Sequence, residues 1–155
     1  MPFGIPVEVD SEGVPYVTAT VHWRKRRTSA AIRFLLDTGA YDIALSADDA
    51  EKLGAALDDL PVSRWPIGGI GGEVESYDLP GVSVGFADSS GRRLELRIRT
   101  VRVMGYPKGE YSADRRPYVP SLLGRAFLKR GRFVLLYDFE LGAARLEMKD
   151  ASASR

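Results

Sequence analysis

Hydrophobic and polar residues alternate in short runs along most of the chain, a pattern that is typical of β-strands. Two such runs, VPYVTATVHW (Val14–Trp23) and SAAIRFLL (residues 29–36), flank the basic residues Arg24–Arg27. We therefore predict a β-hairpin with this basic cluster at its tip. The run RRLELRIRTVRV (residues 92–103) alternates clearly, and RFVLLYDFELGAARLEMK (residues 132–149) predicts a final hairpin.

Two short segments have helical rather than strand character. In SADDAEKLG, Ser46 is a suitable N-cap, Asp48 and Asp49 lie near the positive end of the helix dipole, and Gly54 ends the helix. SLLGRAFLKRG (residues 121–131) predicts an apolar strand, a glycine and a second short helix. The pattern therefore predicts a mostly β fold with one or two short helices.

No stretch of the sequence is a clear linker, so we expect one domain over residues 1–155. Residues 1–30 are interpreted as an N-terminal extension and hairpin. Met104–Pro120 has no periodicity and contains three prolines. A loop this long is expected to be either functional or mobile.

Composition narrows the possible functions. The net charge is +1, with no large basic excess, which argues against a dedicated nucleic-acid or membrane-surface protein. There is no cysteine and only one histidine, His22, so we expect no metal site and no thiol chemistry. No apolar run approaches the roughly 20 residues of a membrane span, and the N-terminus does not resemble a signal peptide. We expect a cytoplasmic protein.

The first candidate for chemistry is Asp37-Thr38-Gly39, which directly follows the apolar run AIRFLL. A carboxylate at the end of a buried strand must be paired, hydrogen-bonded or protonated. The Thr38 hydroxyl and the Gly39 N–H are both able to hold it in place. The alternative is a purely structural turn, in which the aspartate bonds its own backbone two residues on.

The second candidate is the glycine-rich segment IGGIGG (Ile67–Gly72). A phosphate-binding loop would need a lysine and a hydroxyl residue after the glycines, followed by a helix. Here Glu73-Val74-Glu75 follow, with strand character. A flexible hairpin turn is the better interpretation, and its glycines would let the backbone lie close to a bound peptide.

Three segments, taken in order, resemble the retropepsins, the retroviral-type aspartic proteases. The first is Leu35–Ala40, in which two leucines lead into the sequence D-T-G-A. The second is the glycine-rich Ile67–Gly72, and the third is LLGRAFL (Leu122–Leu128). The match covers about residues 31–148. It implies a closed retropepsin-like acid-protease β-barrel with a flap hairpin and one or two short helices.

The resemblance also implies a chemistry. One D-T-G per chain supplies one carboxylate, so an active aspartic endopeptidase would be a homodimer in which two Asp37 side chains meet and activate water. This needs a peptide or protein substrate and no cofactor. The implied catalytic residues are Asp37, Thr38 and Gly39, and the implied substrate-binding residues are Ala40, Asp42, Ile67, Gly68, Gly69, Ile70, Gly71 and Gly72.

The sequence departs from the family pattern at Tyr41. Retropepsins carry an aspartate here, which pairs with the arginine corresponding to Arg125. In this chain Arg125 must find Asp42 or another carboxylate, or the pairing is lost. Ala40 stands where pepsin-like enzymes commonly have a hydroxyl residue.

Other functions remain as alternatives. The same fold could serve as a catalytically silent dimeric peptide-binding or dimerisation module. The basic residues Arg24–Arg27 and the strand Arg92–Arg102 could contact nucleic acid, but the balanced net charge makes this secondary at most. A serine hydrolase lacks support, because there is no G-x-S-x-G.

Overall fold

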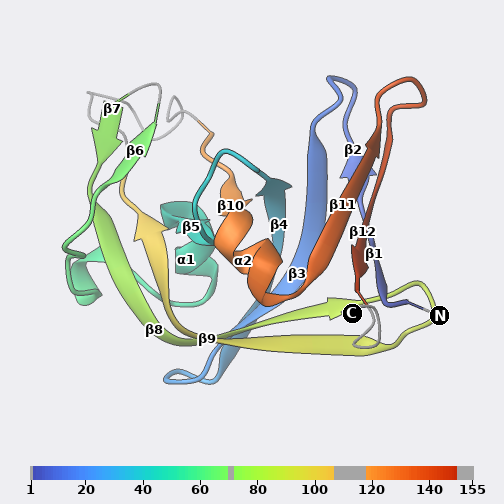
Figure 1. Cartoon of the computed structure of the whole chain (residues 1–155). Coiled ribbons are helices and arrows are strands. Elements are labelled where there is room, and N and C mark those ends of the chain that lie inside the picture. Colours follow the sequence, from blue (N-terminus) through green and yellow to red (C-terminus); the bar gives the residue numbers. More distant parts are fainter. Residues whose placement is uncertain (1, 70–71, 107–117, 150–155) are drawn as a thin grey trace.

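The computed structural model describes residues 2–69, 72–106 and 118–149, in which β-strands predominate (Figure 1). The strands are β1 (Gly4–Pro6), β2 (Glu8–Val9), β3 (Pro15–Trp23), β4 (Thr28–Leu36), β5 (Ala44–Ser46), β6 (Ile67–Gly69), β7 (Gly72–Val74), β8 (Ser76–Ala87), β9 (Arg93–Met104), β10 (Ser121–Leu123), β11 (Phe133–Asp138) and β12 (Ala143–Met148). Two short helices, α1 (Ala47–Lys52) and α2 (Arg125–Arg130), and a 3-10 turn, η1 (Leu57–Asp59), complete the described elements. The predicted mostly β fold is confirmed.

Six strands close into a barrel. In the larger sheet the strand order is β2-β3-β4-β10-β5-β9-β8, and β8 also pairs with β3. The ring β3-β4-β10-β5-β9-β8 therefore returns to its first strand, leaving β2 outside it. Closure satisfies the backbone hydrogen bonds that edge strands would otherwise expose.

The predicted hairpins are present. β3 and β4 pair in antiparallel register from Tyr16↔Leu35 to Trp23↔Thr28, with the basic cluster at the tip. The final predicted hairpin is β11 paired with β12. β8 and β9 form a further long hairpin and pair along their whole length. β12 also pairs with β1, which makes a separate three-stranded sheet beside the barrel.

Alternation along the strands places apolar side chains inside the barrel. The fully buried side chains include Ile32, Phe34, Leu45, Leu79 and Leu123 from four different strands. Full burial of a side chain of this size contributes about 1.5–3 kcal/mol. Strand β4, which leads to Asp37, is therefore anchored in the core.

The aromatic residues Phe86, Phe127 and Phe133 join helix α2 to the barrel and to the three-stranded sheet. Their ring centroids lie 5.9–6.3 Å apart. This spacing is favourable for aromatic pairs. The cluster fixes α2 in front of the barrel (Figure 1).

Helix α1 begins and ends as the sequence predicted. The Ser46 hydroxyl accepts a hydrogen bond from the Asp49 N–H at 3.1 Å, and Gly54 follows the helix with a φ of 77°. Both helices have six residues, and in the described chain no helix has the length and apolar character to cross a membrane.

Candidate active site

Asp37 lies directly after β4, at one end of the barrel. Leu36 is buried, whereas Asp37 is half-buried and Thr38 and Gly39 are exposed. The Asp37 N–H donates to the carbonyl oxygen of Leu123 at 3.1 Å, which continues the parallel pairing of β4 with β10. The carboxylate is therefore held at the rim of the core on a fixed backbone, and is less buried than the sequence indicated.

Backbone N–H groups hold one oxygen of this carboxylate. Oδ1 of Asp37 accepts from the Gly39 N–H at 2.8 Å and from the Ala40 N–H at 3.2 Å. A Cβ at position 39 would lie 3.1 Å from Oδ1, so glycine allows the close approach. The bond from Gly39 is the one expected both for a held catalytic carboxylate and for a structural turn. In the single chain the Thr38 hydroxyl makes no hydrogen bond among the described residues, and Ala40 supplies the second donor.

The D-T-G-A loop is also bound to the start of α2. The carbonyl oxygen of Ala40 accepts from the Arg125 N–H at 3.0 Å, and that of Tyr41 accepts from the Ala126 N–H at 2.7 Å. At Gly124 the two segments are so close that a Cβ would lie 2.7 Å from three backbone atoms of Ala40 and Asp42. The glycine before the helix is thus required by packing against the loop.

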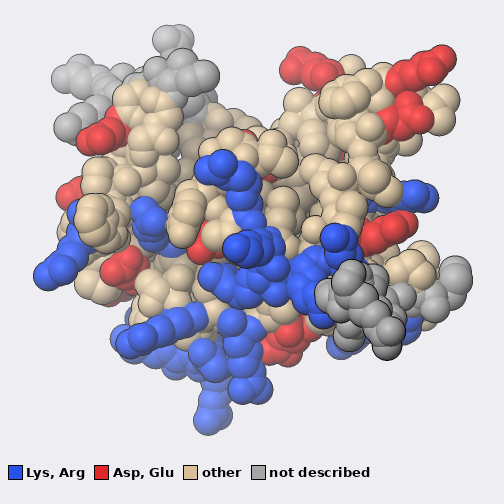
Figure 2. Space-filling view, in the orientation of Figure 1, with Lys and Arg blue, Asp and Glu red and all other residues tan. Residues whose placement is uncertain are grey.

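A cleft of about 830 Å³ opens above the carboxylate. Its walls include residues of the D-T-G-A loop, the hairpin β6–β7, strand β9 and the start of α2. Figure 2 shows the molecule hollowed between two raised parts, which correspond in Figure 1 to the hairpins β6–β7 and β11–β12. A volume of this size is in the range of known ligand sites.

The cleft brings together most of the residues that the sequence singled out. Its lining includes Asp37, Gly39, Ala40, Asp42, Ile67, Gly68, Gly69 and Gly72. Thr38 is adjacent in the loop but does not line the cleft. Ile70 and Gly71 lie outside the described residues. The catalytic and substrate-binding roles of these residues are predictions.

The glycine-rich segment forms the predicted hairpin where it is described. Ile67 pairs with Val74, Gly68 with Glu73 and Gly69 with Gly72. The base of the hairpin is fixed, because the Ser76 hydroxyl donates to the Trp65 carbonyl at 2.6 Å.

Beside this base, the Tyr77 hydroxyl donates to Glu75 at 2.9 Å. This hydrogen bond, with burial and the Glu75 charge, raises the pKa of Tyr77. Tyr77 thus remains neutral and keeps the bond across the physiological range.

The pairing that the family makes through Arg125 is replaced. Asp42 lies 3.5 Å from the guanidinium of Arg130, one turn further along α2, and its other oxygen accepts from the Ile43 N–H at 2.8 Å. Among the described residues, no carboxylate lies within 4.0 Å of Arg125. Tyr41, which stands at the family's aspartate position, is 69% exposed and lines the cleft.

The sequence did not predict Arg102 and Met104 as residues of the cleft. It marked Arg102 only as part of the basic strand Arg92–Arg102. In the fold, β9 pairs with β5 at Ala44↔Arg102, directly after the D-T-G-A loop. Only this long-range pairing brings the end of β9 to the site, and alternation along the strand carries no signal of it.

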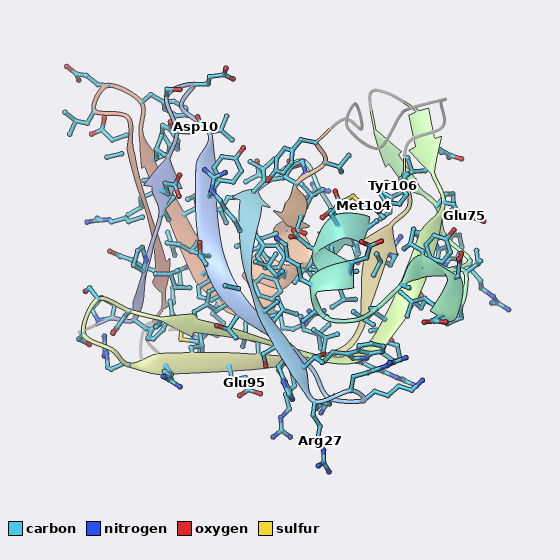
Figure 3. All side chains as sticks on the ribbon, turned by 180° about the vertical axis from the view of Figure 1, so that it is seen from behind. Asp10, Arg27, Glu75, Glu95, Met104 and Tyr106 are labelled. Atoms are coloured by element: carbon cyan, nitrogen blue, oxygen red, sulfur yellow. The ribbon has the colours of Figure 1, made fainter. Side chains whose placement is uncertain are left out.

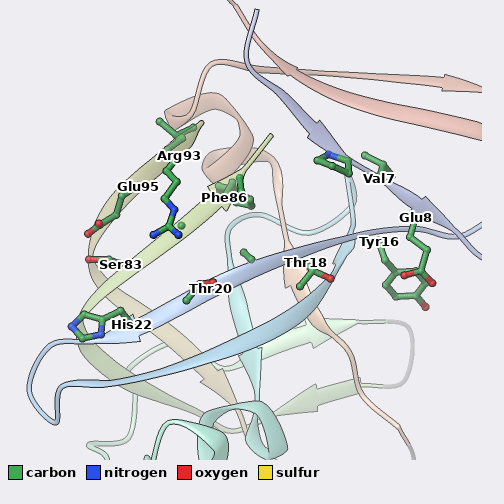
Figure 4. A pocket seen from close by; sticks show the side chains of 15 residues that line it. Val7, Glu8, Tyr16, Thr18, Thr20, His22, Ser83, Phe86, Arg93 and Glu95 are labelled. Atoms are coloured by element: carbon green, nitrogen blue, oxygen red, sulfur yellow. The ribbon is translucent and has the colours of Figure 1, made fainter. Parts of the chain in front are cut away.

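The one histidine lies away from the cleft. A second hollow, of about 630 Å³, is lined by residues that include His22, Thr20, Ser83 and Arg93 (Figure 4). His22 Nδ1 lies 2.8 Å from the Ser29 hydroxyl. Within the described part of the chain, no group of three or more histidine and acidic side chains is placed to hold a metal ion.

Comparison with known proteins agrees with this geometry. The family model described as "Aspartyl protease" matches residues 26–127. The crystal structure of a retropepsin-like aspartic protease from Rickettsia conorii aligns with a TM-score of 0.58 at 23% identity, over 94% of this chain and 90% of that chain. EIAV protease complexed with the inhibitor HBY-793 aligns with a TM-score of 0.45 at 21% identity, over 79% of this chain and 92% of that chain.

Among curated proteins no sequence matches this chain. The family model spans the strand that leads to Asp37, the carboxylate loop and the start of α2. The Rickettsia conorii structure shares the closed barrel that the sequence predicted. The chain belongs to the retropepsin-like aspartyl protease family.

Proposed function

We propose that the protein is an aspartic endopeptidase that works as a homodimer, with Asp37 of each subunit forming the catalytic pair. The observation that carries the proposal is the state of the Asp37 carboxylate. Oδ1 is held by two N–H groups, whereas the described residues offer Oδ2 no hydrogen-bond partner. Oδ2 is thus available to a water molecule or a second carboxylate.

The need for a second subunit follows from the chemistry available in the cleft. Peptide hydrolysis by this route requires two carboxyl groups that share one proton. The other aspartate of the cleft, Asp42, is engaged by Arg130 and by the Ile43 N–H. A second Asp37 from an identical chain is therefore the better source. The exposure of Thr38 and Gly39 in the single chain leaves the loop open to such a partner.

In the proposed reaction, the ionised carboxylate takes a proton from water while the protonated one polarises the substrate carbonyl. The proton on the second group then helps to release the amine. The N–H groups of Gly39 and Ala40 hold this carboxylate in position. The hairpin β6–β7 would act as the flap, closing over the peptide to exclude water and opening for release.

Asp37→Asn tests the mechanism, because one substitution alters both halves of the pair. We expect peptide-library cleavage between about pH 4 and 7 to fall by several orders of magnitude, since the pair supplies both general acid and general base. Cleavage that persists in the purified variant would refute the mechanism. Binding without cleavage in the wild type would favour the silent peptide-binding module.

Asp10→Asn is a matched control. Asp10 also holds a turn through Oδ1, which accepts from the N–H groups of Glu12 and Val14, both at 2.9 Å. Figure 3 shows Asp10 toward the β11–β12 hairpin, while Met104, a residue of the cleft, lies on the side of the β6–β7 hairpin. This variant should keep full cleavage activity.

Dilution tests the dimer separately from the carboxylate. Activity per mole should fall through the concentration range in which sedimentation shows dimers dissociating. Activity that stays constant while the protein is fully monomeric would refute the shared site.

A further inference from the structure

Two guanidinium groups belong to the residues that line the cleft around Asp37. Arg102 comes from the end of β9 and Arg125 from the first position of α2. They are 23 positions apart in sequence and meet at one cleft because β9 and β10 both pair with β5. Neither was part of the site that the sequence predicted.

The negative charge of the cleft is already balanced in part. Of its two aspartates, Asp42 is paired with Arg130, which is not itself a lining residue. Among the described residues, neither Arg102 nor Arg125 has a carboxylate within 4.0 Å. Within the described part of the chain the Arg102 guanidinium donates to the Trp65 carbonyl at 3.4 Å.

The loss of the family's ion pair therefore has a consequence for the cleft. With tyrosine at position 41 and Asp42 held by Arg130, the Arg125 side chain is exposed and keeps its hydrogen-bonding groups for other partners. A guanidinium presents a planar fork of donors that matches a carboxylate. In a cleft closed over a peptide, such a pair is shielded from solvent and becomes stronger.

We propose that Arg102 and Arg125 select substrates with a carboxylate close to the scissile bond. This inference rests on the proposed function, because it assumes that peptides bind in the cleft. Ile67, Val74 and Met104 give the same cleft apolar walls, so the favoured peptide combines apolar and acidic residues. A two-fold axis would repeat both arginines, which places the preference on either side of the cut.

The carboxylate has two possible sources, an internal Asp or Glu side chain and the free C-terminus of a peptide. Probe peptides of the form acetyl-Ala-Ala-X-Leu-Phe-X-Ala-Ala separate them. At one X position, a peptide carries either Glu or its neutral isostere Gln. Each of these peptides is made in two forms, one with a free C-terminus and one with an amidated C-terminus. Selection of Glu in amidated peptides identifies an internal acid, and selection of free termini in Gln peptides identifies the C-terminus.

The measured quantity is the ratio of kcat/KM for the carboxylate peptide to that for its neutral partner. For the wild type in low salt we expect a ratio of about ten at one X position at least, as for a shielded charge-assisted hydrogen bond. This ratio should approach one in Arg125→Gln, in Arg102→Gln or in both variants. The prediction concerns the ratio only, so it holds even if a substitution also lowers both kcat/KM values. It should also shrink in about 0.5 M salt.

Lys129→Gln is the control for net charge. Lys129 is exposed on the same helix but does not line the cleft, so this variant should keep the wild-type ratio. A wild-type ratio near one for every peptide pair, or a ratio that neither arginine substitution lowers, would overturn the inference. An equal loss in Lys129→Gln would show a general charge effect and would also overturn it.

Binding to the Asp37→Asn protein separates this inference from the proposed function. The same fluorescently labelled peptides are titrated, and the ratio of dissociation constants replaces the ratio of kcat/KM. Selective binding that depends on Arg125 or Arg102, without cleavage by the wild type, would support the inference and refute the protease. Cleavage by the wild type without selection for a carboxylate would support the protease and refute the inference.

Discussion

Gly124→Ala adds one atom, a Cβ, at the contact between the D-T-G-A loop and helix α2. Gly124 has a φ of −95° and a ψ of −177°, which alanine adopts without backbone strain. The new Cβ, however, would lie 2.7 Å from the Ala40 carbonyl oxygen and from the N and O atoms of Asp42. Ordinary contacts of a Cβ are 3.4–4 Å, so the overlap is large and all three neighbours are backbone atoms.

Two opposing effects set the size of the change. Replacing glycine stabilises the folded state by about 0.4–1 kcal/mol through the unfolded chain. Overpacking a tight contact costs about 1–3 kcal/mol. All neighbours of the new Cβ are backbone atoms, so no flexible side chain can move to relieve the overlap. The steric cost should therefore exceed the gain, and we expect the free energy of unfolding to fall by about 1–2 kcal/mol. For a chain of this size that corresponds to about 2–8 °C in Tm.

The same displacement should reach the carboxylate. Ala40 both donates to Asp37 and borders Gly124, so moving its backbone away from the helix shifts the groups that fix Oδ1. A misplacement of catalytic groups by about 1 Å can lower the rate about 100-fold. We therefore expect kcat to fall further than the loss of folded protein explains.

Urea unfolding and peptide cleavage measure the two effects. Gly4→Ala is the control, because Gly4 lies in β1 with no heavy atom within 4 Å of a new Cβ and no positive φ. It should be neutral or slightly stabilising, opposite in sign to Gly124→Ala. If both variants unfold at the wild-type urea concentration, the steric reasoning at Gly124 is wrong.

Two further predictions concern pH. Ala40→Ser places a hydroxyl beside the Asp37 carboxylate, where the Ala40 N–H is already bonded, and should favour its charged form. The acidic limb of the cleavage profile should then move to lower pH, while Ala40→Gly, which adds no donor, should leave it in place; an unmoved limb in the serine variant would contradict the reasoning. The second prediction concerns the pH dependence of stability and rests on Asp88. Burial opposes the charge of Asp88, but hydrogen bonds from Ser90 and Arg92 lower its pKa from 3.8 to about 2. Because the folded pKa lies below the unfolded value, this contribution is present above about pH 4 and is lost as the pH falls toward 2. Urea unfolding of Asp88→Asn should therefore depend less on pH than the wild type between pH 5 and 2, and parallel curves would show that Asp88 has no such role.

Local signals predicted much of this molecule. Alternation and turn residues placed the hairpin β3–β4, the capping serine placed α1, and the glycine before Arg125 placed α2. These features depend on residues close in sequence, which is why a pattern can reveal them. The D-T-G-A loop was found in the same way, because its apolar strand and its glycine are adjacent.

Contacts across the fold were not predictable in this way. The sequence left open whether Arg125 pairs with Asp42, and the structure gives that carboxylate to Arg130. Arg125 and Arg130 are both on α2, so only the position of the helix against the loop decides between them.

The sequence by itself determined that the chain is mostly β and that an apolar strand ends in Asp37-Thr38-Gly39. Both follow from the chemistry of neighbouring residues. Only the tertiary structure decided which distant residues share the cleft. Arg102 reaches it because β9 pairs with β5, and such a pairing depends on closure of the whole barrel rather than on any local preference.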